Sequence, residues 1–144
     1  MYKRIFLDAN VIADLFDNTR VFHQHSKEVL LFLAEDTAVE LFTSCDIVTT
    51  LYYILAKRDK QKALDAILQI NELCSVVEFS NAEILQSCKL MQTDKTYKDL
   101  EDTIQYVMAK KINAGLILTN DKGFVSEDIK IINSENFHKK YVQK

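Results

Sequence analysis

Residues 4–12 read RIFLDANVI, and this stretch decides the fold. The segment Arg4–Asp8 is a short apolar run that ends on an acid, which is typical of a buried parallel strand. A helix can begin directly afterwards at Asn10, because apolar residues then recur at helical spacing as far as Phe16. A strand followed at once by a helix predicts an α/β fold with Asp8 at the carboxyl end of the first strand.

Strands and helices alternate along the rest of the sequence. Further strands are predicted at residues 39–43, 75–79, 116–119 and 129–132, and helices at residues 10–16, 22–34, 45–57, 63–73, 81–91 and 99–113, with a short helix from residue 134. Ser44 is a predicted N-cap, and Ser80 with Glu83 forms a capping-box pattern. The alternation indicates a mostly parallel sheet with helices on both faces. Because the sequence contains no linker or internal repeat, we expect one domain over residues 1–144.

The composition is ordinary for a soluble protein. The chain has 144 residues, of which 48% are apolar and 27% charged, and its formal net charge is −3. It therefore lacks the overall basic field of a non-specific DNA-binding protein, although residues that bind nucleic acid can still be local. No apolar run approaches ~18 residues, so we expect no signal peptide and no membrane span, and we place the protein in the cytoplasm.

The cysteine content indicates the state of the thiols, and the glycine content excludes two phosphate-binding motifs. Cys45, Cys74 and Cys88 are odd in number and lack Cys-x-x-Cys spacing, which is typical of buried, reduced thiols. The chain has two glycines and no proline. The dinucleotide-binding fingerprint and the P-loop both need glycines where the backbone approaches phosphate, so both are excluded.

Four acidic residues stand where predicted strands end or a helix begins, namely Asp8, Asp99, Asp102 and Asp121. Ligands of an open α/β sheet bind beyond the carboxyl ends of its strands, where Asp8 and Asp121 are expected. Asp99 and Asp102 share one helix face, and by themselves they would be explained by capping and by the helix dipole. Carboxylates that are brought together repel one another, and Mg²⁺ or Mn²⁺ relieves this repulsion. The four acids together therefore indicate a metal site for chemistry on phosphates.

Three motifs in this order resemble those of the PIN domain. They are FLDANVI at residues 6–12, DLEDT at residues 99–103 and TNDKGF at residues 119–124. Within that family the chain is similar to the small bacterial proteins that include the VapC-type toxins, and the similarity in length, element order and spacing covers essentially the whole chain. The resemblance implies a Rossmann-like, three-layer α/β/α sandwich and a ribonuclease that cuts single strands with Mg²⁺ or Mn²⁺.

The resemblance also implies roles for individual residues and for partners. The implied catalytic and metal-binding acids are Asp8, Asp102 and Asp121. The residues that match supporting positions, or lie beside the acids as alternative ligands, are Asn10, Ser44, Asp99, Glu101 and Thr119. A hydroxide formed at the metal would attack the RNA phosphodiester in line. An antitoxin partner and a homodimer are implied as well.

One position departs from the family pattern. PIN nucleases usually carry a glutamate on the helix after the second strand, and counting from Ser44 places it near Thr50, where the chain has no acid. Asp46 lies on the same helix about one turn too early, and it is better interpreted as a first-turn acid that complements the helix dipole. We therefore expect a metal site that is weaker, shifted or compensated by Asp99.

Two other functions compete with the nuclease. A phosphatase of the haloacid dehalogenase type also uses an aspartate at the end of strand one, but it normally needs a second aspartate where this chain has Asn10. A PIN-like module that binds RNA or a protein without cutting is favoured by the missing glutamate and by the acidic balance. Whether the protein cuts RNA or only binds it, the basic segment Lys57–Lys62 could contact the RNA backbone, although a solvated turn between helices explains this segment more simply.

Overall fold

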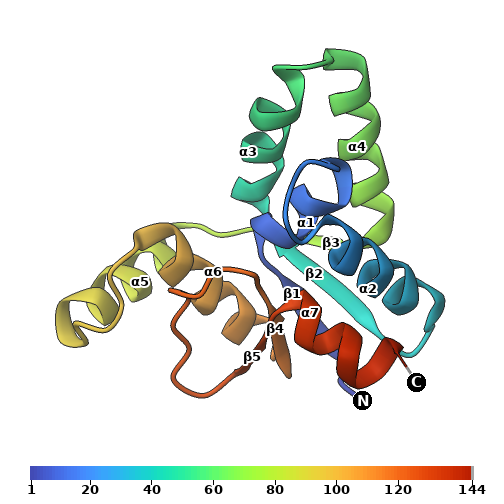
Figure 1. Ribbon diagram of the computed structural model, residues 1–144. Helices are drawn as coiled ribbons and strands as arrows, with labels where there is room; N and C mark the ends of the chain where they lie inside the picture. Colours follow the sequence, from blue (N-terminus) through green and yellow to red (C-terminus); the bar gives the residue numbers. More distant parts are fainter. Residues whose placement is uncertain (144) are drawn as a thin grey trace.

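A five-stranded, entirely parallel sheet forms the centre of the computed structural model, which describes residues 1–143 (Figure 1). The strands are β1 (Arg4–Leu7), β2 (Glu40–Ser44), β3 (Ser75–Val77), β4 (Leu116–Leu118) and β5 (Lys130–Ile132). Their order is β3-β2-β1-β4-β5. The chain therefore builds outward from β1 on one side and then returns to build on the other, so the strand order reverses between β1 and β4. In open α/β sheets this reversal marks the place where ligands bind.

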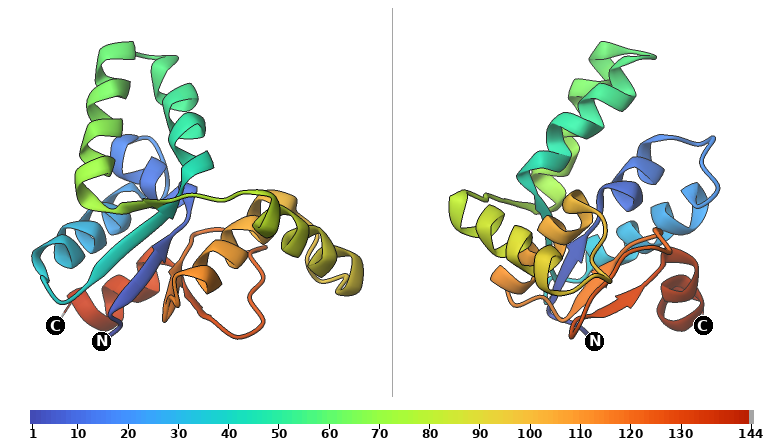
Figure 2. Two further views of the ribbon diagram at one scale, coloured as in Figure 1. Left: turned by 180° about the vertical axis from the view of Figure 1, so that it is seen from behind. Right: turned by 90° about the vertical axis from the view of Figure 1, so that its left-hand side faces the viewer.

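Helices cover both faces of the sheet (Figure 2). They are α1 (Ala9–Phe16), α2 (His23–Glu35), α3 (Cys45–Ala56), α4 (Lys60–Leu73), α5 (Asn81–Thr93), α6 (Leu100–Lys111) and α7 (Ser134–Phe137), and α7 continues into the π-helical turn η1 (His138–Val142). The helices α3 and α4 form an antiparallel pair that projects away from the sheet, and α5 and α6 lie together on the opposite side of the molecule (Figure 1).

The two faces of the sheet contain separate hydrophobic cores because side chains alternate along each strand. Ile5 and Leu7 of β1 point to the face that packs against α1, α2, α3, α4 and α7. Phe6 points to the other face, where it packs with Ile117 and with residues of α6 such as Met108. The three-layer sandwich with a mostly parallel sheet is therefore confirmed.

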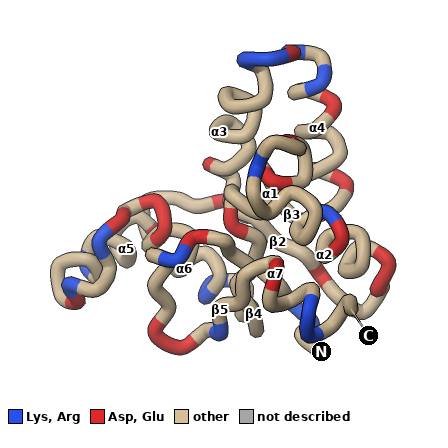
Figure 3. The backbone as a smooth tube through the Cα atoms, in the orientation of Figure 1, with Lys and Arg blue, Asp and Glu red and all other residues tan. Residues whose placement is uncertain are grey.

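Several element boundaries differ from the sequence predictions by one to three residues. Helix α4 begins at Lys60, three residues earlier than predicted, because the Asp59 carboxylate accepts hydrogen bonds from the backbone N–H groups of Gln61 (3.0 Å) and Lys62 (3.1 Å). The basic segment 57–62 is therefore partly helical, and it forms the outer tip of the α3–α4 pair (Figure 3). Strand β3 ends at Val77, two residues earlier than predicted.

All three cysteines are free, as expected. Cys74 is buried, and this burial raises the pKa of its thiol to about 12. Cys45 and Cys88 are partly exposed, so the expectation of burial was wrong for these two. Among residues 1–143 no helix combines the length and the apolar character that crossing a membrane requires.

Candidate catalytic site

The site begins where β1 and β4 end side by side. Leu7 and Leu118 are paired across the two strands, so the next residues, Asp8 and Thr119, meet at the same edge of the sheet. The backbone N–H of Asp8 donates to the carbonyl of Leu118 (3.0 Å), and the Thr119 hydroxyl donates to Asp8 Oδ2 (2.6 Å). This arrangement fixes the first acid at the point where the strand order reverses.

Asp8 is held as a buried, hydrogen-bonded carboxylate. Its side chain is only 3% exposed. Oδ1 accepts a bond from the Ala9 N–H (2.7 Å), and Oδ2 accepts a second bond from Asn10 Nδ2 (3.0 Å) in addition to that from Thr119. Burial raises the pKa of Asp8, the bonds from Thr119 and Ala9 lower it, and the charge of Asp121 raises it. Asn10 and Thr119 thus both donate to the Asp8 carboxylate, and their supporting role in catalysis stays a prediction.

Asp102 comes to the site on the first turn of α6. Asp99 is the N-cap of this helix, and its carboxylate accepts a hydrogen bond from the Asp102 N–H (2.9 Å). Burial, a hydrogen bond with Asp121 and the charges of the other acids raise the pKa of Asp102 to about 8. Among those charges are Asp8 and Asp99. The folding of α6 against the sheet therefore concentrates negative charge at the β1–β4 edge.

Asp121 lies in the exposed loop after β4, and its own backbone positions it. Its N–H donates to Thr119 Oγ1 (3.1 Å), and its Oδ1 accepts from the Gly123 N–H (2.8 Å). A Cβ atom on Gly123 would lie 3.3 Å from that same oxygen, which is a tight contact. A glycine at position 123 therefore lets the loop close around the Asp121 carboxylate.

Two further acids face the same cluster. Burial raises the pKa of Glu101, and so do the charges of Asp46, Asp8 and Asp99. Asp46 therefore lies near Glu101. It is an acid of the first turn of α3, as the dipole interpretation requires, and its charge also acts on Glu101. Its carboxylate also accepts a hydrogen bond from the Ser44 hydroxyl.

Ser44 is the N-cap residue of α3, as predicted, and Thr50 lies on the same helix without an acidic group. Ser44 has the extended backbone of an N-cap, but its side chain makes no capping bond to α3, because the hydroxyl is directed to Asp46 instead. The Thr50 side chain is exposed, and its hydroxyl donates to the Asp46 carbonyl of its own helix (3.3 Å). On α3 it is therefore Asp46, and not Thr50, whose side chain acts on the acidic cluster, through its charge on Glu101.

The donor set suits a hard divalent cation. All of its charged groups are carboxylates. Burial first and then their mutual repulsion raise the pKa of Asp102, and a bound cation relieves both effects. Within residues 1–143, however, no three acidic, histidine or cysteine side chains converge closely enough to hold an ion by themselves. The acids lie near one another but do not form a complete coordination site. Binding an ion therefore requires side-chain adjustment or oxygen ligands from a substrate.

Gln105 is a site residue that the sequence analysis missed. It lies three residues after Asp102 on the same face of α6, its side chain is 1% exposed, and its amide lowers the pKa of Asp8 by hydrogen bonding. Its Oε1 is buried without a hydrogen-bond partner in the described part of the chain, which is costly for a polar atom. The three-residue spacing from Asp102 was the available signal, but an uncharged glutamine gave no reason to use it.

Asn120 is the second residue that was missed, and it connects the site to the surrounding helices. Its N–H donates to Asn10 Oδ1 (3.0 Å), and its Nδ2 donates to the buried Asp14 carboxylate (2.6 Å). Its Oδ1 accepts from both the N–H and the hydroxyl of Ser134, each at 2.9 Å. Asp14 is itself paired with Arg20 (2.7 Å). One side chain thus joins the β4 loop to α1 and α7.

Comparison with known proteins agrees with this geometry. The sequence matches the PIN domain family over residues 5–130. It is 44% identical over 135 residues to Ribonuclease VapC1 of Aquifex aeolicus, covering 94% of this chain and 93% of that protein. Mycobacterium tuberculosis VapC20, described as a toxin that cleaves the sarcin-ricin loop, superimposes with a TM-score of 0.66 at 19% identity, covering 85% of this chain and 98% of that one.

A second solved structure shares the fold at lower sequence identity. VapBC2 of Rickettsia felis, solved with a DNA fragment from its promoter, superimposes with a TM-score of 0.69 at 15% identity. The match covers 90% of this chain and 98% of that one. At such identities the structural matches establish a shared fold, and the similarity to the Aquifex protein establishes the closer relationship.

Proposed function

This chain belongs to the PIN-domain family, and we propose that it is a metal-dependent ribonuclease that acts as the toxin of a toxin–antitoxin pair. One observation carries the proposal most directly. Asp8, Asp102 and Asp121, which are far apart in sequence, lie close together where the strand order reverses. The charge of Asp121 raises the pKa of Asp8, and the charges of Asp8 and Asp121 add to burial in raising the pKa of Asp102. A haloacid dehalogenase phosphatase does not fit this family assignment.

We propose Mg²⁺ or Mn²⁺ as the metal and Asp8, Asp102 and Asp121 as the residues that would hold it. When bound, the ion supplies a Lewis acid for a phosphate oxygen and a water of lowered pKa. The protein's own residues prepare this chemistry. Thr119 and Asn10 hold Asp8 in one orientation, and Asp102 must lose its proton before it can serve as a ligand. Glu101 and Asp46 add negative charge at the rim, and we propose that Asp46 replaces the usual helix glutamate.

Cleavage of single-stranded RNA with Mn²⁺, compared with EDTA, tests the ribonuclease. We expect wild-type protein to cut and the variants Asp8→Asn and Asp102→Asn to lose at least ~100-fold in rate, because each removes a charged oxygen ligand. Asp65→Asn, on the exposed face of α4, is the matched control and should retain full activity. Circular dichroism of each variant excludes unfolding as the cause. Intact cleavage by Asp8→Asn would contradict the assignment.

A non-cutting RNA-binding module is the second candidate, and a specific observation favours it. No acid occupies position 50, and no three described side chains form a ready cage for an ion. RNA binding in EDTA, together with no cleavage of varied RNA substrates in either metal, would establish this alternative.

We propose an antitoxin partner that covers an apolar groove. A cavity of about 350 Å³ opens between α1, α2 and α4, and most of its lining residues are apolar, namely Leu15, Phe16, Leu30, Leu31, Ala34, Ile70 and Leu73. Leu31 is 55% exposed at its rim. An amphipathic antitoxin helix would bury this surface. Leu31→Asp should then abolish co-purification with the protein of the adjacent gene, without loss of RNA cleavage.

The remaining features are also proposals. We propose that residues 1–144 form one domain that works in the cytoplasm as a homodimer. Light scattering after size-exclusion chromatography gives the oligomeric state, and a monomer at micromolar concentration would contradict the dimer.

A further inference from the structure

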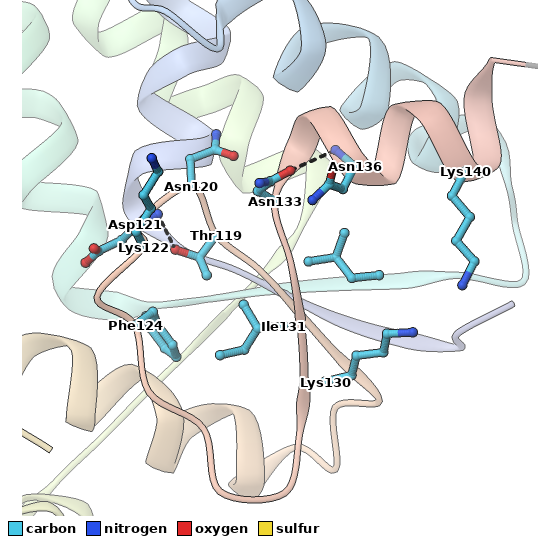
Figure 4. Close-up of a pocket in the computed structure, with 11 residues that line it drawn as sticks. Thr119, Asn120, Asp121, Lys122, Phe124, Lys130, Ile131, Asn133, Asn136 and Lys140 are labelled. Carbon is cyan, nitrogen blue, oxygen red and sulfur yellow. Dashed lines mark hydrogen bonds between the residues drawn. The ribbon is translucent and has the colours of Figure 1, made fainter. Parts of the chain in front are cut away.

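A second cavity begins at the catalytic site and extends along the edge strand (Figure 4). Its volume is about 320 Å³, at the lower end of the ~300–1,000 Å³ typical of small-ligand pockets. One end is formed by the loop Thr119–Phe124, which contains Asp121. The other end lies between β5 and the turn η1, where Figure 4 shows Lys130 and Lys140. The pocket therefore connects the proposed metal-binding acid to a group of basic side chains.

The charges around the pocket are unbalanced. Lys122, Lys130 and Lys140 line it, and Asp121 is the only carboxylate among the lining residues that the structure describes. Within residues 1–143 none of these lysines forms an ion pair, whereas the neighbouring Lys139 pairs with Glu135 (2.7 Å). The Lys140 ammonium lies over the Tyr141 ring, 5.2 Å from its centre. Ammonium groups gathered without counter-charges attract an anion.

The rest of the lining suits a nucleobase. Phe124 and Ile131 supply apolar surface between the polar ends. Asn133 uses its Oδ1 to cap α7 by accepting from the Asn136 N–H (2.7 Å), and both asparagine amides lie at the rim of the pocket. Single-stranded RNA is recognised by contact with base faces and by hydrogen bonds to base edges, and its phosphates are bound by basic side chains. The pocket offers groups for each of these contacts.

We propose that this pocket binds one nucleotide of the RNA strand next to the phosphate that is cut. The base lies on Phe124 and Ile131, and the adjoining phosphate is bound by Lys130 and Lys140. Asp121 at the opposite end repels a free phosphate, so the strand is directed with its flanking phosphate toward the lysines. This subsite rests on the proposed ribonuclease function, since it assumes that the strand passes Asp121.

The subsite is tested by the salt dependence of RNA binding. A fluorescein-labelled oligouridine is titrated in EDTA, which prevents cleavage, and anisotropy is recorded at several KCl concentrations. Each lost phosphate contact lowers the slope of log K against log salt by ~0.7 for single strands. Because the two lysines share one phosphate, we expect Lys130→Ala/Lys140→Ala to reduce the slope by ~0.7 and to weaken binding ~10-fold or more at low salt. The variant Lys130→Arg/Lys140→Arg, which keeps both positive charges, should bind the oligouridine like the wild-type protein.

A matched control removes the same charge elsewhere. Lys89 and Lys95 are exposed at α5 and just after it, outside the pocket, and Lys89→Ala/Lys95→Ala should leave the slope unchanged. An unchanged slope in the pocket variant, an equal loss in the control, or no binding by wild-type protein would each overturn the subsite. If wild-type protein cuts RNA and the pocket variant binds normally, the subsite fails and the ribonuclease stands. If nothing is cut but the pocket variant shows the expected loss, the ribonuclease fails and the pocket is a nucleotide-binding site of a protein that binds RNA without cutting it.

Discussion

Replacing Asp102 by asparagine should stabilise the metal-free protein at the same time as it abolishes cleavage. In the folded protein, burial, the hydrogen bond with Asp121 and the charges of Asp8, Asp121 and Asp99 raise the pKa of Asp102 from 3.8 to about 8. An acid whose pKa is raised on folding binds its proton more tightly in the native state. Its contribution to stability is therefore lost as pH rises from about 4 to about 8. Asparagine keeps the neutral form at every pH.

The expected gain in the free energy of unfolding is smaller than the full pKa shift would give, for two reasons. One pKa unit corresponds to ~1.4 kcal/mol for a group shielded from water. Asp102 is half-buried, so screening by solvent leaves only ~1–2 kcal/mol at pH 8. The variant also loses the favourable interaction of a carboxylate with the N-terminus of α6, which is ~0.3–1 kcal/mol. A net stabilisation of ~1 kcal/mol at pH 8 remains, and almost none is expected at pH 4.

Urea unfolding in EDTA at pH 4 and pH 8 measures this difference, with Asp65→Asn as the exposed control. Saturating Mn²⁺ should reverse the order, because an ion at ~100 times its Kd stabilises the wild-type protein by ~2.7 kcal/mol and the variant by much less. A variant that is no more stable than wild type at pH 8 in EDTA would refute the reasoning, since burial and the neighbouring acids would then not disfavour the charged form of Asp102.

Three further predictions concern the support of the site. Thr119→Val removes the 2.6 Å hydrogen bond to Asp8, so the pKa of Asp8 should rise further. The affinity for Mn²⁺, measured by calorimetry at pH 6, should then fall ~10-fold or more, and an equal affinity would contradict the supporting role. Asp14→Asn breaks the buried pair with Arg20 and should lower the free energy of unfolding by ~2 kcal/mol in urea; no loss would mean that the network carries little stability. Asp59→Ala removes the cap of α4 and should cost ~1 kcal/mol while RNA cleavage stays intact; a large loss of cleavage would show that the α3–α4 tip takes part in function.

The sequence was sufficient for the β/α order and for the positions of the acids. Apolar runs that end on Asp8 and just before Thr119 left little choice for β1 and β4, and parallel strands bring their carboxyl ends together. Asp99 and Asp102 were correctly placed at the start of one helix, where Asp99 proved to be the cap. Local patterns determine these features, and for that reason they could be predicted.

Other parts of the site depend on contacts that no local pattern contains. The direction of the Ser44 hydroxyl depends on Asp46 rather than on the cap position. Lys122, Lys130 and Lys140 surround one pocket only because β5 and η1 return beside the β4 loop. Gln105 gave no chemical signal until the fold placed its amide next to Asp8.

The position of Asn120 has a consequence for the protein during its own synthesis. Thr119, which holds the Asp8 carboxylate, is made 111 residues after Asp8, and Ser134, which fixes Asn120, is made later still. A nascent chain therefore carries an incomplete site until residues 116–134 have left the ribosome, since β4 must pair with β1 and Ser134 must reach Asn120. An enzyme that attacks RNA would thus stay inactive beside the ribosome and messenger that produce it until these segments have folded onto β1.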